Sequence, residues 1–396
     1  MKRSPQTTRV ALLLALVLSL ALVAAGCGGD DDDEEAGETT AATDTGGAGA
    51  AADCEGSVGI MAPITGDAAA IGEEQLNFGK FAVSQYNEEN GTSFELVEGD
   101  TQLDPAQAST VGQRFISDDA ILAVVGPAGS QEVEAVGPIF TRENLGFVSA
   151  SATRTSLTES GDFPTFARVV PNDDAQGPTI GNFIADELDA QTVFIIDDQT
   201  SYSTGLADSA TTALEEQDIT VERDSVSQDQ SDFSALVGRV ADADVVFLPW
   251  QLANKAQVFS EQLKEQGSDA VVFGSDGLFS DDFTQVDAYV SSFAPDVKAI
   301  ESSAELVSAY EAEYGEFAST FGPPVYAATT VVLEAISRAC EEGEPTRESV
   351  SEQIMETSTD ESILGSGITF DDNGDVEGAE FYIFQVKGPG EYELVS

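Results

Sequence analysis

Residues 121–136, ILAVVGPAGSQEVEAV, join an apolar run to a helix-like stretch through a turn of small residues. The run 121–126 is rich in Val and Ile, which is typical of a buried strand. Helical spacing of the apolar residues begins at Ser130. Because the turn between them holds only Gly, Pro and Ala, we predict that another group comes very close to the backbone there.

The same alternation of short apolar runs and amphipathic stretches continues along most of the chain. It predicts an α/β fold in which parallel sheets are covered by helices on both faces, with enough units for two such sheets. Ligands bind such sheets in the crevice at the carboxyl ends of the strands. The strand-like runs are 57–62, 94–98, 121–126, 146–150, 192–198, 218–226, 244–249 and 270–276.

The loops that follow these strands are small and polar. None contains the phosphate-binding pattern GxxxxGK[ST] or a GxGxxG that enters a helix, which disfavours a nucleotide as ligand. The loops are MAPITG (61–66), VGPAGS (125–130), SASAT (149–153), DDQTSY (197–202), FLPWQ (247–251) and FGSDG (273–277).

The composition is strongly acidic and lacks histidine. The 396 residues include 72 Asp and Glu against 16 Lys and Arg, for a formal net charge of −56. This balance argues against nucleic acid or an anionic membrane surface as a partner. The absence of His excludes metal sites that need imidazole. Because hydrophobic residues still make up 41%, we expect a folded protein with a hydrated acidic surface suited to salty surroundings.

The first 26 residues predict an export signal. A basic start is followed by the apolar run 11–25, which is shorter than the roughly 20 residues of a membrane-spanning helix. The ending AAGC resembles the lipobox of bacterial lipoproteins, although Ala24 stands where Leu is usual. That resemblance implies cleavage before Cys27 and a lipid on Cys27 that anchors the protein to the outer face of the cell membrane. The alternative is a plain secretory peptide with an incidental Cys.

The two remaining cysteines and the stretch before them fit an exported protein. Residues 27–54 are small, polar and acidic, and we expect a flexible linker. Cys54 and Cys340 form an even pair in an oxidising compartment, which suggests a disulfide. Two separate buried thiols are the alternative.

From Gly56 onward the sequence resembles the type I periplasmic binding proteins of the branched-chain amino acid class, which are solute receptors of ABC importers. The resemblance rests on the order and spacing of several segments rather than on any single one. They are IMAPITGDAAAIGEEQLNFGKFAV (60–83), VVGPAGS (124–130), FVSASAT (147–153), ARVVPNDDAQGP (167–178), DDQTSYSTGLA (197–207), FGSDG (273–277) and ITFDDNGDVEGAEFYIFQV (368–386).

The resemblance implies two Rossmann-like lobes that are joined by three crossings and close on a ligand by hinge bending. The crossings are expected near 169–172, 294–296 and 365–368. One lobe would then comprise 56–170 with 297–365, and the other 171–296 with 366–396.

It also implies a set of residues that hold the charged ends of a ligand. Ser130, at a helix N-terminus, and Thr153 would bind a carboxylate, while Thr153 and the backbone carbonyl of Ser151 would also meet an amine. Asp276 takes the place of the acid that pairs with an α-ammonium. The alternative for Ser130 and Thr153 is helix capping, and for Asp276 an Asp-Gly turn.

Four further residues concern the rest of the pocket. Tyr202 matches a Tyr that closes over the ligand from the second lobe, or else is an exposed loop aromatic. Ile71 stands where a bulky aromatic often faces the ligand side chain, and Trp250 and Gln251 stand where the family can present Tyr. These departures leave the side-chain preference open.

The resulting prediction is a lipid-anchored receptor that captures a small zwitterion, most simply an amino acid, and delivers it to an ABC permease. A receptor for an amide, urea or aromatic acid and a ligand sensor for a signalling partner are the alternatives. We expect a monomer, which is the family's usual state, with no cofactor and no metal. An enzyme is not expected, because no His and no activated nucleophile is readable.

Overall fold

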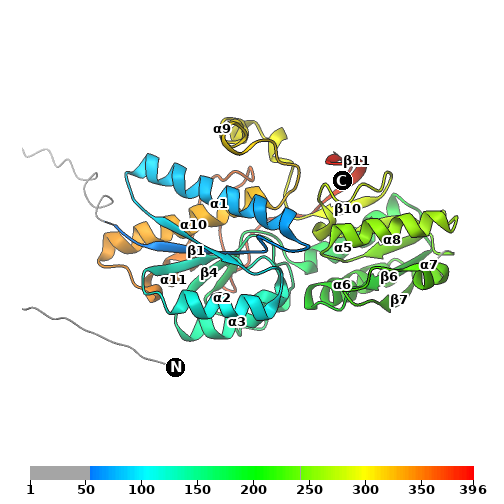
Figure 1. Cartoon of the computed structure of the whole chain (residues 1–396), viewed down its shortest axis with the longest axis horizontal. Helices are drawn as coiled ribbons and strands as arrows, with labels where there is room; N and C mark the ends of the chain where they lie inside the picture. The colour runs from blue at the N-terminus through cyan, green and yellow to red at the C-terminus, as the bar shows by residue number, and fades with distance from the viewer. Residues whose placement is uncertain (1–53, 241) are drawn as a thin grey trace, which may run out of the picture. The chain divides into compact units, whose positions relative to one another are not determined.

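The structure is a computed structural model that describes residues 54–240 and 242–396, and this part of the chain contains two β-sheets (Figure 1). We call the elements on the five-stranded sheet the first lobe and those on the seven-stranded sheet the second lobe. The expected signal peptide, Cys27 and nearly all of the expected linker lie outside the described residues. Within those residues, no helix is long and apolar enough to cross a membrane.

The five-stranded sheet of the first lobe is parallel throughout, in the order β2-β1-β3-β4-β5. Its central strands are buried on both faces, which explains their continuous apolar sequences. The strands are β1 (Ser57–Ala62), β2 (Glu95–Asp100), β3 (Ile121–Val125), β4 (Gly146–Ser149) and β5 (Phe166–Arg168).

Helices cover both faces of this sheet. One face packs against α1 and α10 in a core of Ile, Val and Phe side chains, and the other packs against α2 and α3. The helices of the first lobe are α1 (Ala69–Asn90), α2 (Pro105–Ile116), α3 (Ser130–Arg142), α4 (Ser156–Glu159), α9 (Ala304–Tyr314), α10 (Gly322–Glu342) and α11 (Arg347–Met355).

The seven-stranded sheet of the second lobe has the order β12-β11-β10-β9-β8-β6-β7. Five neighbouring strands are parallel. Four of them match strands predicted from the sequence, whereas β10 was not predicted. The strand β11 runs antiparallel to β10, and a tight turn joins it to β12, which runs antiparallel to β11. The strands are β6 (Thr192–Asp197), β7 (Thr220–Ser225), β8 (Val245–Leu248), β9 (Val271–Gly274), β10 (Tyr289–Ser292), β11 (Tyr382–Gly388) and β12 (Glu391–Leu394).

The second lobe also has helices on both faces of its sheet. The helices α5 (Asp173–Asp186) and α6 (Ser201–Glu216) enclose one apolar core, and α7 (Ser234–Val240) and α8 (Ala253–Glu265) enclose the other. A 3-10 turn, η2 (Asp276–Leu278), follows β9 directly. The carboxyl end of β9 therefore leads straight into one of the residues expected at the ligand site.

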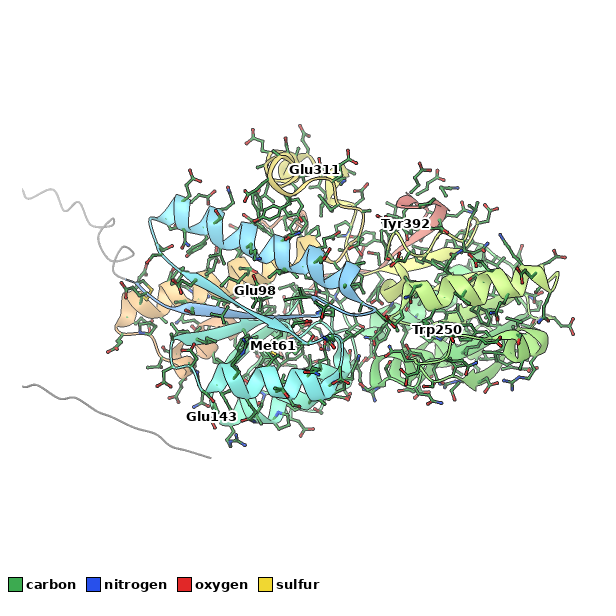
Figure 2. The ribbon with its side chains drawn as sticks, viewed as in Figure 1. Met61, Glu98, Glu143, Trp250, Glu311 and Tyr392 are labelled. Carbon is green, nitrogen blue, oxygen red and sulfur yellow. A yellow bond between two sulfur atoms is a disulfide. The ribbon has the colours of Figure 1, made fainter. Side chains whose placement is uncertain are left out.

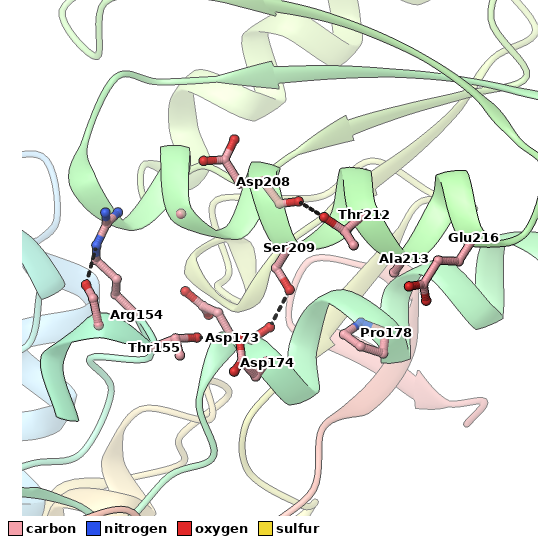
Figure 3. A pocket seen from close by; sticks show the side chains of 12 residues that line it. Arg154, Thr155, Asp173, Asp174, Pro178, Asp208, Ser209, Thr212, Ala213 and Glu216 are labelled. Carbon is pink, nitrogen blue, oxygen red and sulfur yellow. Dashed lines mark hydrogen bonds between the residues drawn. The ribbon is translucent and has the colours of Figure 1, made fainter. Parts of the chain in front are cut away.

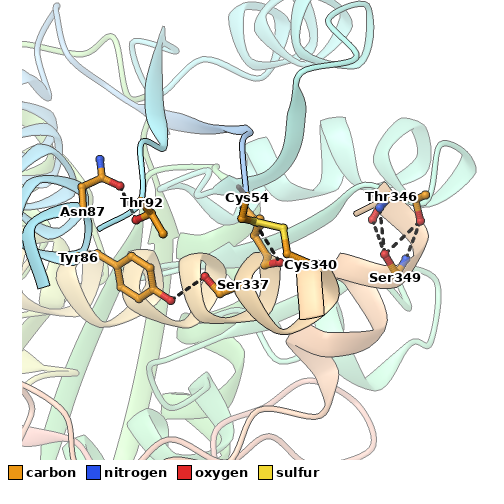
Figure 4. Close-up of a disulfide and its surroundings, with 9 residues drawn as sticks. Cys54, Tyr86, Asn87, Thr92, Ser337, Cys340, Thr346 and Ser349 are labelled. Carbon is orange, nitrogen blue, oxygen red and sulfur yellow. Dashed lines mark hydrogen bonds between the residues drawn. A yellow bond between two sulfur atoms is a disulfide. The ribbon is translucent and has the colours of Figure 1, made fainter. Parts of the chain in front are cut away.

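A disulfide ties the start of the first lobe to one of its helices. Cys54, just before β1, is bonded to Cys340 on α10, with the two Cα atoms 5.9 Å apart (Figure 4). Of the two alternatives for these cysteines, the structure therefore has the disulfide.

A buried arginine holds a late segment of the chain against the first sheet. Arg168 at the end of β5 has a fully buried side chain and forms an ion pair with Asp375. Its guanidinium also donates to the carbonyls of Ala152 (3.0 Å) and Arg154 (2.8 Å). The segment FDDNGD (370–375) is thus held against the first lobe by the ion pair of Asp375, before the chain enters β11. The expected lobe boundaries stay predictions.

The charged residues lie mainly at the surface. Glu98 and Glu143 are exposed, whereas Met61 and Trp250 lie inside the two lobes (Figure 2). Burial of the apolar side chains and exposure of the acids reconcile a folded core with the large net charge.

Candidate ligand-binding site

The turn at 126–129, between β3 and α3, is tight because of a neighbouring strand. Gly126 has a φ of +97°, and a Cβ there would lie 2.3 Å from the carbonyl oxygen of Met61 in β1. Any side chain would therefore collide with backbone. The close approach predicted from the sequence is made, at this position, by the protein itself.

Ser130 is the first residue of α3 and is buried at the end of this turn. Its hydroxyl accepts a hydrogen bond from the backbone N–H of Arg154 at 3.3 Å. The N-cap of α3 is Gly129, whose own N–H donates to the carboxylate of Glu132 at 2.7 Å. Capping therefore does not account for Ser130. The N-terminus of a helix such as α3 favours an anion.

Thr153 and Ser151 follow β4 beside this helix start. Thr153 is fully buried, and its hydroxyl has no hydrogen-bond partner among residues 54–240 and 242–396. The next helix, α4, has Thr155 as its N-cap, so Thr153 is not a cap. The Ser151 hydroxyl donates to the carbonyl of Ala128 (3.0 Å) and accepts from Gln75 on α1 (3.1 Å). Ser151 is thus tied to the turn, whereas Thr153 offers an unused hydroxyl.

Asp276 and Tyr202 meet in the second lobe. The Tyr202 hydroxyl, from the first turn of α6, donates to Asp276 Oδ1 at 2.7 Å. Gln176 on α5 donates to the same oxygen at 2.5 Å and to the Ser291 hydroxyl at 2.8 Å. Burial raises the pKa of Asp276 to about 6, while the hydrogen bonds from Tyr202 and Gln176 lower it. Tyr202 is itself buried, which excludes the exposed-loop alternative.

A second acid, Asp173, lies next to this group and was not identified from the sequence. It is the first residue of α5, 2% exposed, and both of its carboxylate oxygens lack a hydrogen-bond partner in the described part of the chain. Burial, and then the charge of Asp276, raise its pKa to about 7. The Thr153 hydroxyl is close enough to lower that pKa without reaching hydrogen-bond geometry, and the charges of Arg168 and Arg154 lower it further. The Asp173 N–H donates to the Thr153 carbonyl at 2.8 Å.

The signal for Asp173 was present in the segment PNDDAQGP. Asn172 is the N-cap of α5, and its side chain accepts from the N–H of Asp174 at 3.0 Å. The capping role is therefore taken, which leaves the acid that follows it free for another purpose. Gln176, one turn later, likewise has a buried side-chain oxygen without a partner among the residues described.

The structure places the remaining three predicted residues elsewhere. Trp250 belongs to the core of the second lobe, where its indole N–H donates to the Ile196 carbonyl at 2.6 Å and its ring packs on Phe233 and Phe259. Packing therefore explains Trp250, and the expectation that it lines the pocket is not supported. Ile71 packs in the α1–α10 core of the first lobe.

Gln251 contacts the other lobe instead of facing a pocket. Its side-chain amide pairs with that of Gln131 on α3, with donor–acceptor distances of 2.9 and 3.4 Å. Leu252, the next residue, packs in a small apolar cluster with Ala68 and Leu103 of the first lobe. These contacts join the two lobes at one side of the site.

A cavity of about 500 Å³ lies beside Asp173 (Figure 3). It is lined by the loop after Thr153, the start of α5 and one side of α6, and four of its residues are acidic: Asp173, Asp174, Asp208 and Glu216. No group of residues in the described part of the chain has the arrangement of a metal site. Of the candidate ligand residues, Asp173 lines this cavity, whereas Ser130, Thr153, Tyr202 and Asp276 do not. The candidate site combines the Thr153 hydroxyl and the start of α3 in the first lobe with two buried acids next to them.

A family model described as periplasmic binding protein matches residues 56–391. The chain belongs to the periplasmic binding protein family. Its relatives include the leucine-, isoleucine-, valine-, threonine- and alanine-binding protein of Pseudomonas aeruginosa. That protein is 27% identical over 338 residues, which cover 83% of this chain and 89% of the relative. The Leu/Ile/Val-binding protein homolog 2 of Brucella abortus is 29% identical over 340 residues, covering 83% and 89%.

Solved structures support the fold of this periplasmic binding protein. A leucine binding protein, LivK, from Thermotoga maritima superposes with a TM-score of 0.78 at 23% identity, covering 86% of this chain and 98% of the other. LivJ from Streptococcus pneumoniae, a branched-chain amino acid transporter substrate binding protein solved with isoleucine, gives a TM-score of 0.76 at 23% identity, covering 86% and 99%. The α/β fold with two parallel-sheet lobes is therefore confirmed.

Proposed function

We propose that this protein is an extracytoplasmic receptor that captures an amino acid, branched-chain or related, and delivers it to an ABC permease. The relatives are named for binding leucine, isoleucine and valine. The observation that supports the proposal best is the group of buried polar atoms on Thr153, Asp173 and Gln176, next to Asp276, that have no hydrogen-bond partner within the described residues. Buried polar atoms without partners are costly, and a ligand that pairs with them removes that cost.

The proposed binding mode places the two charged ends of the ligand at opposite walls. The carboxylate is held by the N-terminus of α3 with Ser130 and by the Thr153 hydroxyl. The ammonium meets Asp276 and Asp173, with the Ser151 carbonyl as a further acceptor. In the described part of the chain no basic side chain is hydrogen-bonded to either acid, although the charges of Arg168 and Arg154 lower the pKa of Asp173. An ammonium would add a positive charge in direct contact with the two carboxylates.

Binding stabilises the closed arrangement because the ligand contacts groups from both lobes. Ser130 and Thr153 belong to the first lobe, and Tyr202 and Asp276 to the second, so all contacts form together only when the lobes meet. The permease would then recognise the closed form. A ligand sensor for a signalling partner would use the same change and differs only in the partner.

The anchoring and oligomeric state complete the proposal. The protein is exported by residues 1–26, held at the outer face of the membrane by a lipid on Cys27, and acts as a monomer. The acidic surface keeps it soluble at high salt. Intact-mass measurement of the purified mature protein tests the lipid: an unmodified Cys27 at the N-terminus would contradict it.

The experiment that tests the binding function is a thermal-shift and calorimetric screen of the ligand-free protein. We expect L-leucine, L-isoleucine, L-valine or a related amino acid to raise the melting temperature, as mass action requires. Asp276→Asn should lower the affinity for that amino acid. Short amides, urea and 3,4-dihydroxybenzoate form the comparison set. A shift with these compounds and with no amino acid would support the alternative receptor and refute this one.

A further inference from the structure

One arginine crosses from the first lobe to the second beside the candidate site. Arg154, the residue after Thr153, donates through Nη1 to the backbone carbonyl of Ser201 at the start of α6. Figure 3 shows its guanidinium next to that helix. Ser201 directly precedes Tyr202, so this contact reaches the turn that carries a proposed ligand residue.

The first lobe holds Arg154 firmly on its own side. The Arg154 N–H donates to the Ser130 hydroxyl at 3.3 Å, and its carbonyl accepts from Arg168 at 2.8 Å. Nε of Arg154 lies 3.0 Å from the Ser156 hydroxyl and 3.3 Å from a carboxylate oxygen of Glu134 on α3. The side chain is therefore oriented before it meets the second lobe, which reduces the entropy lost in making the contact.

The second lobe makes room for the guanidinium through a glycine. Gly205 lies in the interior of α6, and a Cβ there would be 2.8 Å from Arg154 Nη1. Glycine in a helix interior costs about 1 kcal/mol relative to alanine. At Gly205 the contact made by Arg154 compensates for this cost, because the guanidinium lies in the space that a side chain at position 205 would fill.

We propose that Arg154 is a positioning residue that latches α6 onto the first lobe and so stabilises the closed arrangement without touching the ligand. The latch acts with the Gln131–Gln251 pair, which joins the lobes elsewhere. The Arg154 contact sets the fraction of ligand-free protein that is in the closed form. The apparent affinity for ligand depends on that fraction. The part of the inference that concerns affinity rests on the proposed function, while the part that concerns closure does not.

Two substitutions, one in each lobe, remove the contact between Arg154 and α6. Arg154→Ala removes the donor. Gly205→Ala displaces the guanidinium but leaves its charge in place, and it also raises helix propensity. Arg142→Ala is the matched control, because Arg142 is a first-lobe arginine whose ion pair is with the adjacent Glu143. All variants are made in the chain from Gly28 onward, which keeps every described residue.

The first measurement is small-angle X-ray scattering without ligand. We expect a larger radius of gyration for Arg154→Ala and Gly205→Ala than for wild type and Arg142→Ala. Gly205→Ala should open the protein while its melting temperature is unchanged or higher, a combination that simple destabilisation does not produce. The double variant should be no more open than Arg154→Ala, because both changes remove the same contact.

The second measurement is L-leucine binding by calorimetry and stopped flow. Each latch variant should lose about ten-fold in affinity, through faster dissociation. Equal radii of gyration and equal leucine affinities in wild type and all the variants would overturn the latch and leave the proposed function standing. Opening of the two latch variants in a protein that binds no amino acid would support the latch and refute the proposed function.

Discussion

Replacing Asp173 by Asn should raise stability and lower affinity at the same time. The Asp173 carboxyl is buried beside Asp276 without a hydrogen-bond partner in the described part of the chain, and its pKa is raised from 3.8 to about 7. Between these two values the folded protein holds a proton that the unfolded chain has lost. The free energy of unfolding therefore falls as the pH rises through this range.

The size of the effect follows from the shift. About three pKa units at about 1.4 kcal/mol each correspond to at most ~4 kcal/mol of stability lost by pH 8. An Asn at this position carries no charge, so Asp173→Asn should recover a large part of that loss at pH 8 and almost none at pH 4. Because Asp173 and Asp276 titrate as a pair, Asp276→Asn should recover part of it too.

Urea unfolding of the ligand-free protein at pH 4 and pH 8 measures this difference. Asp186→Asn is the matched control, since Asp186 is an exposed acid at the other end of α5. Calorimetry on the same proteins should show that Asp173→Asn weakens leucine binding by about 2–5 kcal/mol, as expected when one partner of a buried charge pair is removed. A variant that is less stable at pH 8, or that binds leucine as well as wild type, would refute the reasoning.

Three further changes test the scaffold of the site. Gly126→Ala should lower the free energy of unfolding by about 3 kcal/mol or more, because its Cβ would meet the Met61 carbonyl, whereas Gly161→Ala, with a φ of +70° and open space around it, should cost only about 1 kcal/mol. Cys340→Ser should cost about 2–5 kcal/mol in urea unfolding under oxidising conditions and nothing relative to wild type under reducing conditions. Gln251→Ala removes the amide pair between the lobes and should weaken leucine binding by about 1 kcal/mol in calorimetry, whereas an unchanged affinity would show that the pair contributes nothing to closure.

Local order along the chain could be read directly from the sequence. Apolar runs near 57–62 and 121–126 become strands because β-branched residues suit a sheet covered on both faces. The small polar loops after them could be assigned to one end of the sheets, because parallel strands all end at the same edge. The pairing of Tyr202 with Asp276 follows the same logic, since both residues follow strands of one sheet.

Tertiary packing decided what each loop residue does. Trp250 and Gln251 are neighbours in sequence, yet the first lies in a core and the second reaches the other lobe. In the sequence, Asp173 is one of two adjacent acids at the start of a helix. Only the packing of η2 and of the loop between β4 and α4 brings Asp276 and Thr153 next to it. The sequence determined the periodic elements and the edge where a solute binds, because both depend on local spacing. Contacts between residues about a hundred positions apart, such as Gln176 and Asp276, decide which side chains at that edge lack a partner. Only the packed lobes specify these contacts.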